Sequence, residues 1–287
     1  MKNKYVTPAP RKLLLFFLIL FLFHFRLNAE PAEKNNVSPF LVFHDLGRNI
    51  LSSVTYNFGL NFLGAGFGTW VFIESGIDWE WRNIAYNNAW LANAGLPMLF
   101  MGYIVPILTP IPLYLAGFFT SNVKLQVTAV ALLQALAITQ LFHVPAKMIT
   151  GRSTPGVISG VFFEPNNHRD PRVKDFSGEF SWFKLDFYDG WPSGHTACAF
   201  SAAAVISDIY SDRPWIKFGA YTYAVLMGIS VSVNTHWLSD SLAGALYGFA
   251  VGKVVARSFN RMLGKDTERD KIRFYAAPDR IGILYQY

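Results

Sequence analysis

A histidine and an aspartate four residues apart form the chemically most suggestive pair in the chain. His236 and Asp240 stand at the beginning of an apolar stretch, in the polar run 234–240. Residues four apart project from one face of a helix. The carboxylate can therefore accept the proton of one ring nitrogen and leave the other nitrogen free as a nucleophile. The alternative is an ion pair at a helix start that serves only packing.

A second histidine follows a run that favours the start of a helix. Pro192, Ser193, Gly194 and His195 precede an alanine-rich apolar stretch. Proline and serine suit the first positions of a helix, and the exposed amide groups there bind anions. Glycine lets a ligand approach the backbone closely. We therefore expect the amides near Ser193 and Gly194 to bind an anion, with His195 holding or donating a proton beside it.

A lysine and an arginine end an apolar stretch further upstream. Lys147 alone would be interpreted as an anchor at the membrane interface. Arg152 follows five residues later, after a glycine, and its guanidinium presents several donors in a fork that suits phosphate oxygens. The two cations together therefore favour a phosphate-binding role.

Helices that cross a membrane can bring these three clusters to one face. The loop 147–194 holds no apolar stretch able to span, so its two ends lie on the same side. From His195 to His236 is 41 residues (236 − 195), which is one helix across and one helix back. The sequence therefore predicts that Lys147, His195 and His236 lie on the same face.

The apolar stretches divide the chain into segments. Spans of about 20 residues are expected at roughly 90–118, 124–146, 196–211, 215–235 and 237–258. The stretch 51–74 contains asparagines, a glutamate and glycines, and we expect it to lie at the interface or partly buried. A basic start followed by a short apolar core predicts a signal peptide or signal anchor. The predicted segments are the signal, 1–29, an extracytoplasmic or interfacial helical segment, 30–88, a membrane domain, 89–258, and a basic C-terminal tail, 259–287.

The composition agrees with a membrane protein. Of the 287 residues, 52% are hydrophobic and only 15% are charged, whereas soluble domains average about 25% charged. The net charge is +6, but the basic residues gather in the tail, which suits an anionic membrane face better than nucleic acid. The positive-inside bias then places the tail in the cytoplasm and the loop 147–194 outside. Cys198 is the only cysteine, which excludes a disulfide framework.

The three clusters resemble the motifs of the type 2 phosphatidic acid phosphatase (PAP2) family, which is related to the vanadium haloperoxidases. The family pattern is Lys, six residues, Arg-Pro; then Pro-Ser-Gly-His; then Ser-Arg, five residues, His, three residues, Asp. The matching positions are Lys147, Pro155, Pro192 to His195, His236 and Asp240. The resemblance covers about 147–258 and implies an all-α, polytopic membrane bundle with about six core helices.

The resemblance also implies an activity, the hydrolysis of lipid phosphate or diphosphate monoesters. His236 would attack phosphorus and form a phosphohistidine, and Asp240 would orient its ring. His195 would protonate the leaving oxygen and then activate water. The phosphate would be held by Lys147, Arg152 and the amides of Ser193 and Gly194. Neither a metal nor another cofactor is expected, and the partners are membrane lipids and the lipid phosphate substrate.

Two positions depart from the family pattern. Thr154 and Ser230 stand where the family has arginines. One alternative is therefore a catalytically impaired relative that binds anionic headgroups or partners. Candidate replacement cations lie in the loop, at His168, Arg169, Arg172 and Lys174. A transporter is a further alternative; it predicts polar residues at the centres of the spans, where few occur beyond Gln126, Gln134 and Gln140.

Overall fold

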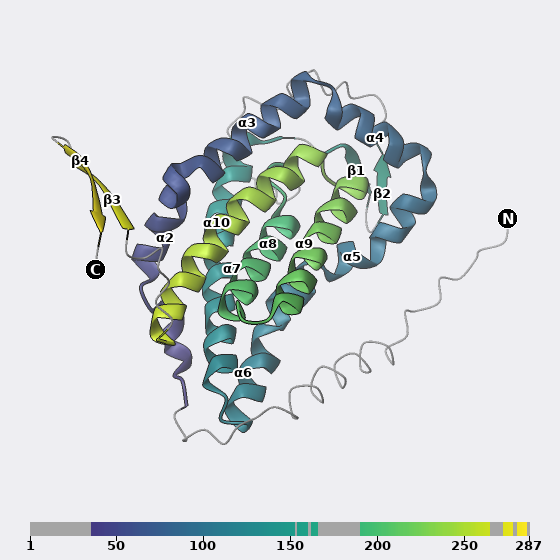
Figure 1. Ribbon diagram of the computed structural model, residues 1–287. Helices are drawn as coiled ribbons and strands as arrows, with labels where there is room; N and C mark the ends of the chain where they lie inside the picture. Colours follow the sequence, from purple (N-terminus) through teal and green to yellow (C-terminus); the bar gives the residue numbers. More distant parts are fainter. Residues whose placement is uncertain are drawn as a thin grey trace.

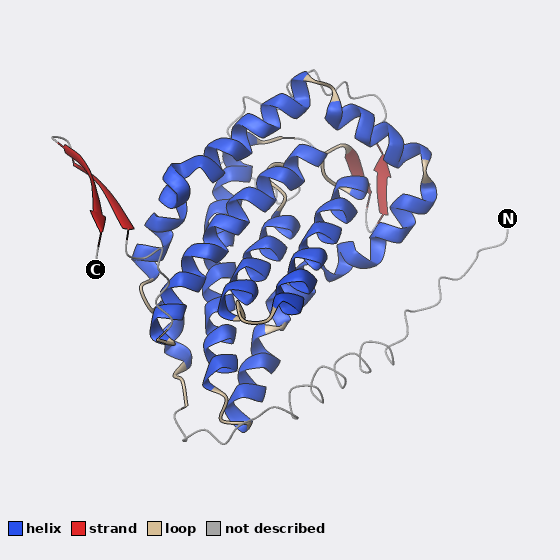
Figure 2. Cartoon of the chain, viewed as in Figure 1, coloured by secondary structure: helices blue, strands red, loops and turns tan. Residues whose placement is uncertain are grey.

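The computed structural model shows a bundle of helices with two short hairpins (Figures 1 and 2). It describes residues 36–152, 154–159, 162–165, 190–264, 272–277 and 280–285. The predicted signal, 1–29, lies outside these ranges, and so do the loop cations His168, Arg169, Arg172 and Lys174.

Six helices make up the described part of the predicted membrane domain. They are α5 (Ala89–Leu108), α6 (Pro110–Phe119), α7 (Val123–Thr150), α8 (Gly194–Ile209), α9 (Pro214–Asn234) and α10 (Leu238–Met262). Within the described residues, α5, α7 and α9 are each long and apolar enough to cross a membrane. The prediction of an all-α membrane bundle with about six core helices is confirmed, and the chain is a multi-pass membrane protein.

The centre of the bundle is the contact between α8 and α10. Gly244, Gly248 and Gly252 lie one turn apart on α10, and a Cβ at any of them would collide with a backbone carbonyl of α8. The opposing carbonyls, those of Ser193, Ala197 and Ser201, are also one turn apart. Small residues four apart let two helix backbones approach closely. This contact fixes the start of α8 against the start of α10.

The predicted span 90–118 is two helices rather than one. It divides at Thr109, and Pro110 opens α6. Proline lacks the N–H that would continue the hydrogen-bond ladder, but it fits the first turn of a new helix. Pro97 and Pro106 are tolerated inside α5.

The upstream segment is helical and wraps around the bundle. Its helices are α2 (Leu46–Thr55), α3 (Leu60–Glu74) and α4 (Ile77–Asn87), with short 3-10 turns at Pro39–Phe43 and Tyr56–Gly59. The stretch 51–74 is therefore interrupted, with Gly59 in the left-handed region at φ 74°. In Figure 1, α3 and α4 form an arch at the end of the bundle where α10 begins.

Glutamines on α7 hold the chain before and at the start of α2. The Gln126 Oε1 accepts a hydrogen bond from the Val37 amide at 2.8 Å. The Gln134 Oε1 accepts one from the Asn49 side chain at 2.7 Å. The Gln134 Nε2 donates to the carbonyls of Val42 and His44. These contacts give two of the span-centre glutamines a structural role.

Two antiparallel hairpins lie outside the bundle. One pairs β1 (Gly156–Ser159) with β2 (Phe162–Pro165), and the other pairs β3 (Ile272–Ala277) with β4 (Arg280–Tyr285). The first belongs to the loop after α7, and the second to the predicted C-terminal tail.

Candidate active site

The end of α7 and the starts of α8 and α10 meet at one end of the bundle. The Ser193 amide donates a hydrogen bond to the Asp240 carbonyl at 3.0 Å, which joins the second cluster to the third. The Thr150 hydroxyl donates to the Trp191 carbonyl at 3.1 Å, which joins the first cluster to the second. The predicted convergence of the three clusters is therefore confirmed.

Two histidines and a lysine lie close together at this end. The ring centroids of His195 and His236 are 6.4 Å apart. Lys147 is buried, at 5% exposure, and its charge acts on both rings. A buried ammonium beside two imidazoles is suited to binding an anion between them.

His236 and Asp240 lie together as their spacing predicts. The His236 Nδ1 is 3.4 Å from the Asp240 Oδ2, which also accepts the Trp237 amide at 3.0 Å. The Gly190 carbonyl lies within hydrogen-bonding reach of the same ring. Burial lowers the pKa of His236, so its imidazole is neutral at pH 7. A neutral ring is the form that a nucleophile requires.

The start of α8 has its own hydrogen bonds. Ser193 is the N-cap, and its hydroxyl oxygen accepts the Thr196 amide at 3.4 Å. Because the Ser193 N–H donates to Asp240, the structure gives that amide an acceptor other than a bound anion. The Gly194 amide belongs to the first turn of the helix, where backbone amides face a potential anion.

Arg152 is buried among carboxylates. It is 1% exposed, and its Nη1 donates to the Asp240 Oδ1 at 2.6 Å and to the Ser239 hydroxyl at 2.7 Å. Its Nη2 donates to the Asp78 Oδ2 at 2.9 Å. Arg152 was predicted to bind phosphate, but these contacts direct both terminal nitrogens of the guanidinium to protein carboxylates.

Two residues at this end of the bundle were not predicted from the sequence. Asp78, on α4, is fully buried and accepts from Arg152 and from Ser239. Nothing in the run around Asp78 distinguishes it from an acidic residue at the start of any helix. His143 lies one turn before Lys147, is 4% exposed, and lies near enough to both site histidines for their charges to act on it. Because His143 is four residues before Lys147, the sequence could have placed the two side chains on one helical face.

The two positions that lack the family arginines differ in their surroundings. Ser230 is 3% exposed, and its hydroxyl donates to the Gly95 carbonyl of α5 at 2.5 Å. The close approach of α5 therefore fills the space beside Ser230. Thr154 is half-buried, two residues after Arg152.

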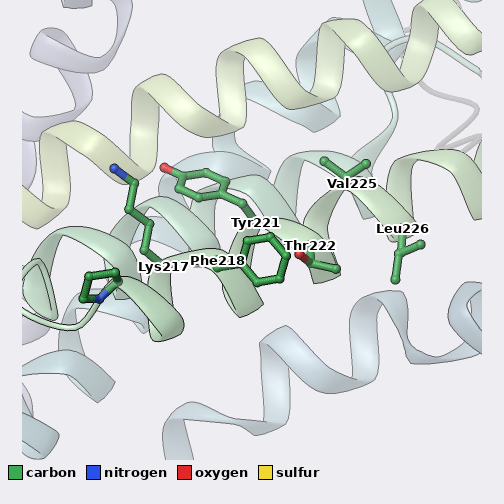
Figure 3. Close-up of a pocket in the computed structure, with 7 residues that line it drawn as sticks. Lys217, Phe218, Tyr221, Thr222, Val225 and Leu226 are labelled. Atoms are coloured by element: carbon green, nitrogen blue, oxygen red, sulfur yellow. The ribbon is translucent and has the colours of Figure 1, made fainter.

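An apolar groove on α9 is separate from these residues (Figure 3). Its lining runs from Pro214 to Leu226, whereas the site residues lie beyond Asn234, at the other end of that helix. At about 1.5 Å per residue, Leu226 is roughly 12 Å and Lys217 roughly 25 Å along the helix from its site end. The groove is therefore not the place where the predicted chemistry would occur.

The central part of the chain is similar to known proteins. Residues 128–262 match the family model of the PAP2 superfamily. A segment of 68 residues is 46% identical to a lipid A 1-phosphatase of Porphyromonas gingivalis. That alignment covers 23% of this chain and 15% of the relative. No solved structure matches the chain.

Proposed function

Since residues 128–262 match the PAP2 superfamily, we propose that this membrane protein hydrolyses lipid phosphate or diphosphate monoesters through a phosphohistidine intermediate. The observation that carries the proposal is the arrangement of His195 and His236. Their ring centroids are 6.4 Å apart with the planes at 65°, Lys147 acts on both rings, and Asp240 contacts His236.

In the first half of the reaction, the neutral His236 attacks phosphorus with its Nε2 while Asp240 holds the proton at Nδ1. A P–N bond forms and the P–O bond to the lipid breaks. Burial lowers the pKa of His195 in the free protein, and the negative charge of the bound phosphate favours the protonated ring, which gives its proton to the departing oxygen. Lys147 balances the charge on the phosphoryl oxygens.

In the second half, a water molecule replaces the lipid product. His195, now neutral, takes a proton from that water as it attacks phosphorus. The P–N bond breaks, phosphate leaves, and His236 returns to its neutral state. His195 thus ends protonated and ready for the next turnover. These two steps require two imidazoles on opposite sides of one phosphoryl group. All the residues that they use lie at this end of the bundle.

A lipid phosphate is the substrate class that fits the position of the site. The clusters lie at the ends of membrane helices, where a lipid presents its headgroup. Because one relative is named a lipid A 1-phosphatase, lipid A is a substrate to include in any screen. The positive-inside bias places the site on the extracytoplasmic side, opposite the basic tail.

Binding without turnover is the second candidate. It is favoured by Ser230, whose packing against Gly95 leaves a serine where the family has an arginine. Each charge-assisted hydrogen bond is worth roughly 1.5–3 kcal/mol, so two missing arginines would slow the reaction by orders of magnitude. A protein of this kind would bind anionic headgroups and release no phosphate.

Phosphate release from purified protein in detergent tests the proposal. The substrates are phosphatidic acid, an isoprenyl diphosphate and lipid A, each with the unmodified protein and with His236→Ala. We expect release from at least one substrate, and its loss in the variant. Binding of all three lipids with no release from any would reject the enzyme and support the binding protein.

The side of the membrane is tested separately. Cys198 is buried, so single cysteines placed at exposed positions give a clean signal. Asn87, at the end of α4, represents the site end, and Asp212, between α8 and α9, represents the opposite end. An impermeant thiol reagent added to intact cells should label Asn87→Cys and spare Asp212→Cys; the reverse pattern would invert the proposed orientation.

A further inference from the structure

Three charged groups from three parts of the chain form one buried cluster behind the candidate nucleophile. The groups are Asp78 on α4, Arg152 after α7 and Asp240 on α10, and each is at most 1% exposed. The Arg152 guanidinium bridges the two carboxylates, at 2.9 Å to Asp78 and 2.6 Å to Asp240. Asp240 in turn contacts His236.

The hydrogen bonds around Asp78 are those of a carboxylate. Its Oδ1 accepts the Ser239 amide at 2.9 Å, and its Oδ2 accepts the Ser239 hydroxyl at 2.5 Å. The same Oδ2 accepts from Arg152. All three partners donate to Asp78, so none requires a proton on it. Burial raises the pKa of Asp78, and the Arg152 charge and the Ser239 hydrogen bond oppose that shift.

The position of Arg152 is fixed from several sides. The guanidinium lies over the Trp237 ring, with its Cζ 5.6 Å from the ring centroid. Ser239 accepts from Arg152 and donates to Asp78, so the hydroxyl joins the cation to the second carboxylate. A bridging guanidinium of this kind matches carboxylates in both charge and geometry.

The charges of the cluster decide how much negative charge reaches His236. With Asp240 and Arg152 alone, the net charge behind the ring would be zero. With Asp78 the sum is −1, because the single guanidinium is shared by two carboxylates. A negative charge behind an imidazole favours its cationic forms and makes the neutral ring more basic. Asp78 therefore increases the nucleophilicity of His236 without touching it.

We propose that Asp78 is a positioning residue of the active site, which holds Arg152 and Ser239 and thereby leaves the charge of Asp240 available to His236. The proposal rests on the proposed function for its kinetic consequences. It extends the site to α4, a helix upstream of the segment 128–262 that matches the superfamily. The family segment alone would then lack one part of its own catalytic apparatus.

The test compares the removal of the carboxylate charge at Asp78 with the removal of a carboxylate charge far from the site. Asp78→Asn keeps the shape and removes the charge, and Asp78→Glu keeps the charge. The matched control is Asp208→Asn, which removes the carboxylate of the Lys253 pair at the opposite end of the bundle. Each protein is purified in detergent, and its folded fraction is measured before the assay.

We expect Asp78→Asn to lower kcat by roughly 10–100-fold with little change in KM, which is the scale for residues that orient a reacting group from behind. Asp78→Glu should recover part of the rate, and Asp208→Asn should leave it unchanged. Equal losses in Asp78→Asn and Asp208→Asn, or no loss in either, would overturn the proposal.

The pH profile separates positioning from a purely structural role. Neutral His236 is needed for attack, so kcat/KM falls as pH falls through its pKa. Other titratable groups also face the ring. Asp240 from α10 and Lys147 from α7 act on it, and its own charge acts on His143 from α7 and His195 from α8. These groups and the titrating substrate are the same for the unmodified protein and for Asp78→Asn, so they do not account for a difference between the two profiles. Loss of the Asp78 charge should therefore move the acid limb to lower pH, and an unmoved limb would contradict the proposal.

A measurement that does not depend on turnover tests the role of Asp78 separately from the proposed function. The His236 ring is titrated by NMR in protein labelled with ¹⁵N-histidine, and His236→Gln provides the assignment. We expect a lower His236 pKa in Asp78→Asn than in the unmodified protein, whether or not phosphate is released. An unmodified protein that is inactive on every lipid would reject the enzyme, and an unchanged His236 pKa would reject the role of Asp78.

Discussion

Ion pairs join the helices at both ends of the bundle, but the two ends differ in how they expose their charges. At the site end, Arg152 and its two carboxylates are at most 1% exposed. At the opposite end, the Lys253–Asp208 pair is as short, at 2.7 Å, but its side chains are 20% and 21% exposed. Water reaches one pair and is excluded from the other.

The difference separates two uses of the same chemistry. Removing two charges from water costs several kcal/mol per ion, so a fully buried pair is weak support for stability as its purpose. A partly exposed pair carries less of that cost and contributes little. Ionisable groups inside a membrane bundle are therefore first interpreted as functional. The buried cluster at the site end is interpreted as functional because one of its members, Asp240, contacts His236.

Among the substitutions at the two ends, neutralising Asp240 should lower the activity most. Asp240→Asn keeps the shape of the side chain but no longer fixes the proton at the His236 Nδ1, so the nucleophile loses its orientation. We expect kcat to fall by roughly 10²–10⁴-fold, the scale for losing the carboxylate partner of a catalytic histidine. Phosphate release is measured beside Asp208→Asn. If both variants lost activity equally, the two ends would not differ in function.

Removing the shared cation tests stability at the site end. Arg152→Met leaves Asp78 and Asp240 buried near each other without a counter-ion. We expect a loss of about 3–5 kcal/mol in the free energy of unfolding, the scale for stranding a buried charge. Denaturation in detergent measures it, and a loss below that of Lys253→Met would contradict the contrast between the two ends.

The family residue at position 230 provides a test of packing. Ser230 is bonded to the Gly95 carbonyl and is 3% exposed, so an arginine has no space there. Ser230→Arg should lower the free energy of unfolding by about 1–3 kcal/mol, as overpacking does, rather than restore turnover. Ser230→Ala is the control, because it removes only the hydroxyl. Higher activity in a stable Ser230→Arg protein would show that the site accepts the missing cation.

The smallest effect is expected at the opposite end. Lys253→Met removes the cation of the partly exposed pair, and we expect a change of about 0–1 kcal/mol in unfolding free energy. Phosphate release should remain unchanged. A larger loss would mean that the Lys253 pair contributes as a buried pair does, and the contrast between the two ends would disappear.

The sequence predicted the helices of the bundle and the convergence of the three clusters because both follow from apolar length and spacing. His236 and Asp240 were predicted to lie on one helical face, and their side chains do lie together. The prediction for 90–118 was wrong in one respect, because Pro110 starts a new helix rather than being absorbed into one.

The cluster behind His236 could not have been predicted from spacing. Asp78 and Arg152 are 74 residues apart in the sequence, and their contact depends on how α4 packs against the start of α10. Arg152 was interpreted as a phosphate ligand because its fork suits phosphate oxygens, but the same fork suits carboxylates equally well. Local sequence gives the chemistry of a guanidinium and not the identity of its partner.

The central claim is that His236 carries the phosphoryl group during turnover, and trapping that intermediate tests it most directly. The protein is mixed with a ³²P-labelled lipid phosphate, quenched in alkali, where phosphohistidine survives, and digested for mass spectrometry. We predict label on the peptide that contains His236 and its loss in His236→Ala. We also predict its accumulation in His195→Gln with ³²P-labelled 4-nitrophenyl phosphate, whose stable phenolate leaves without an acid. Label on another residue, or full phosphate release by His236→Ala, would contradict the account.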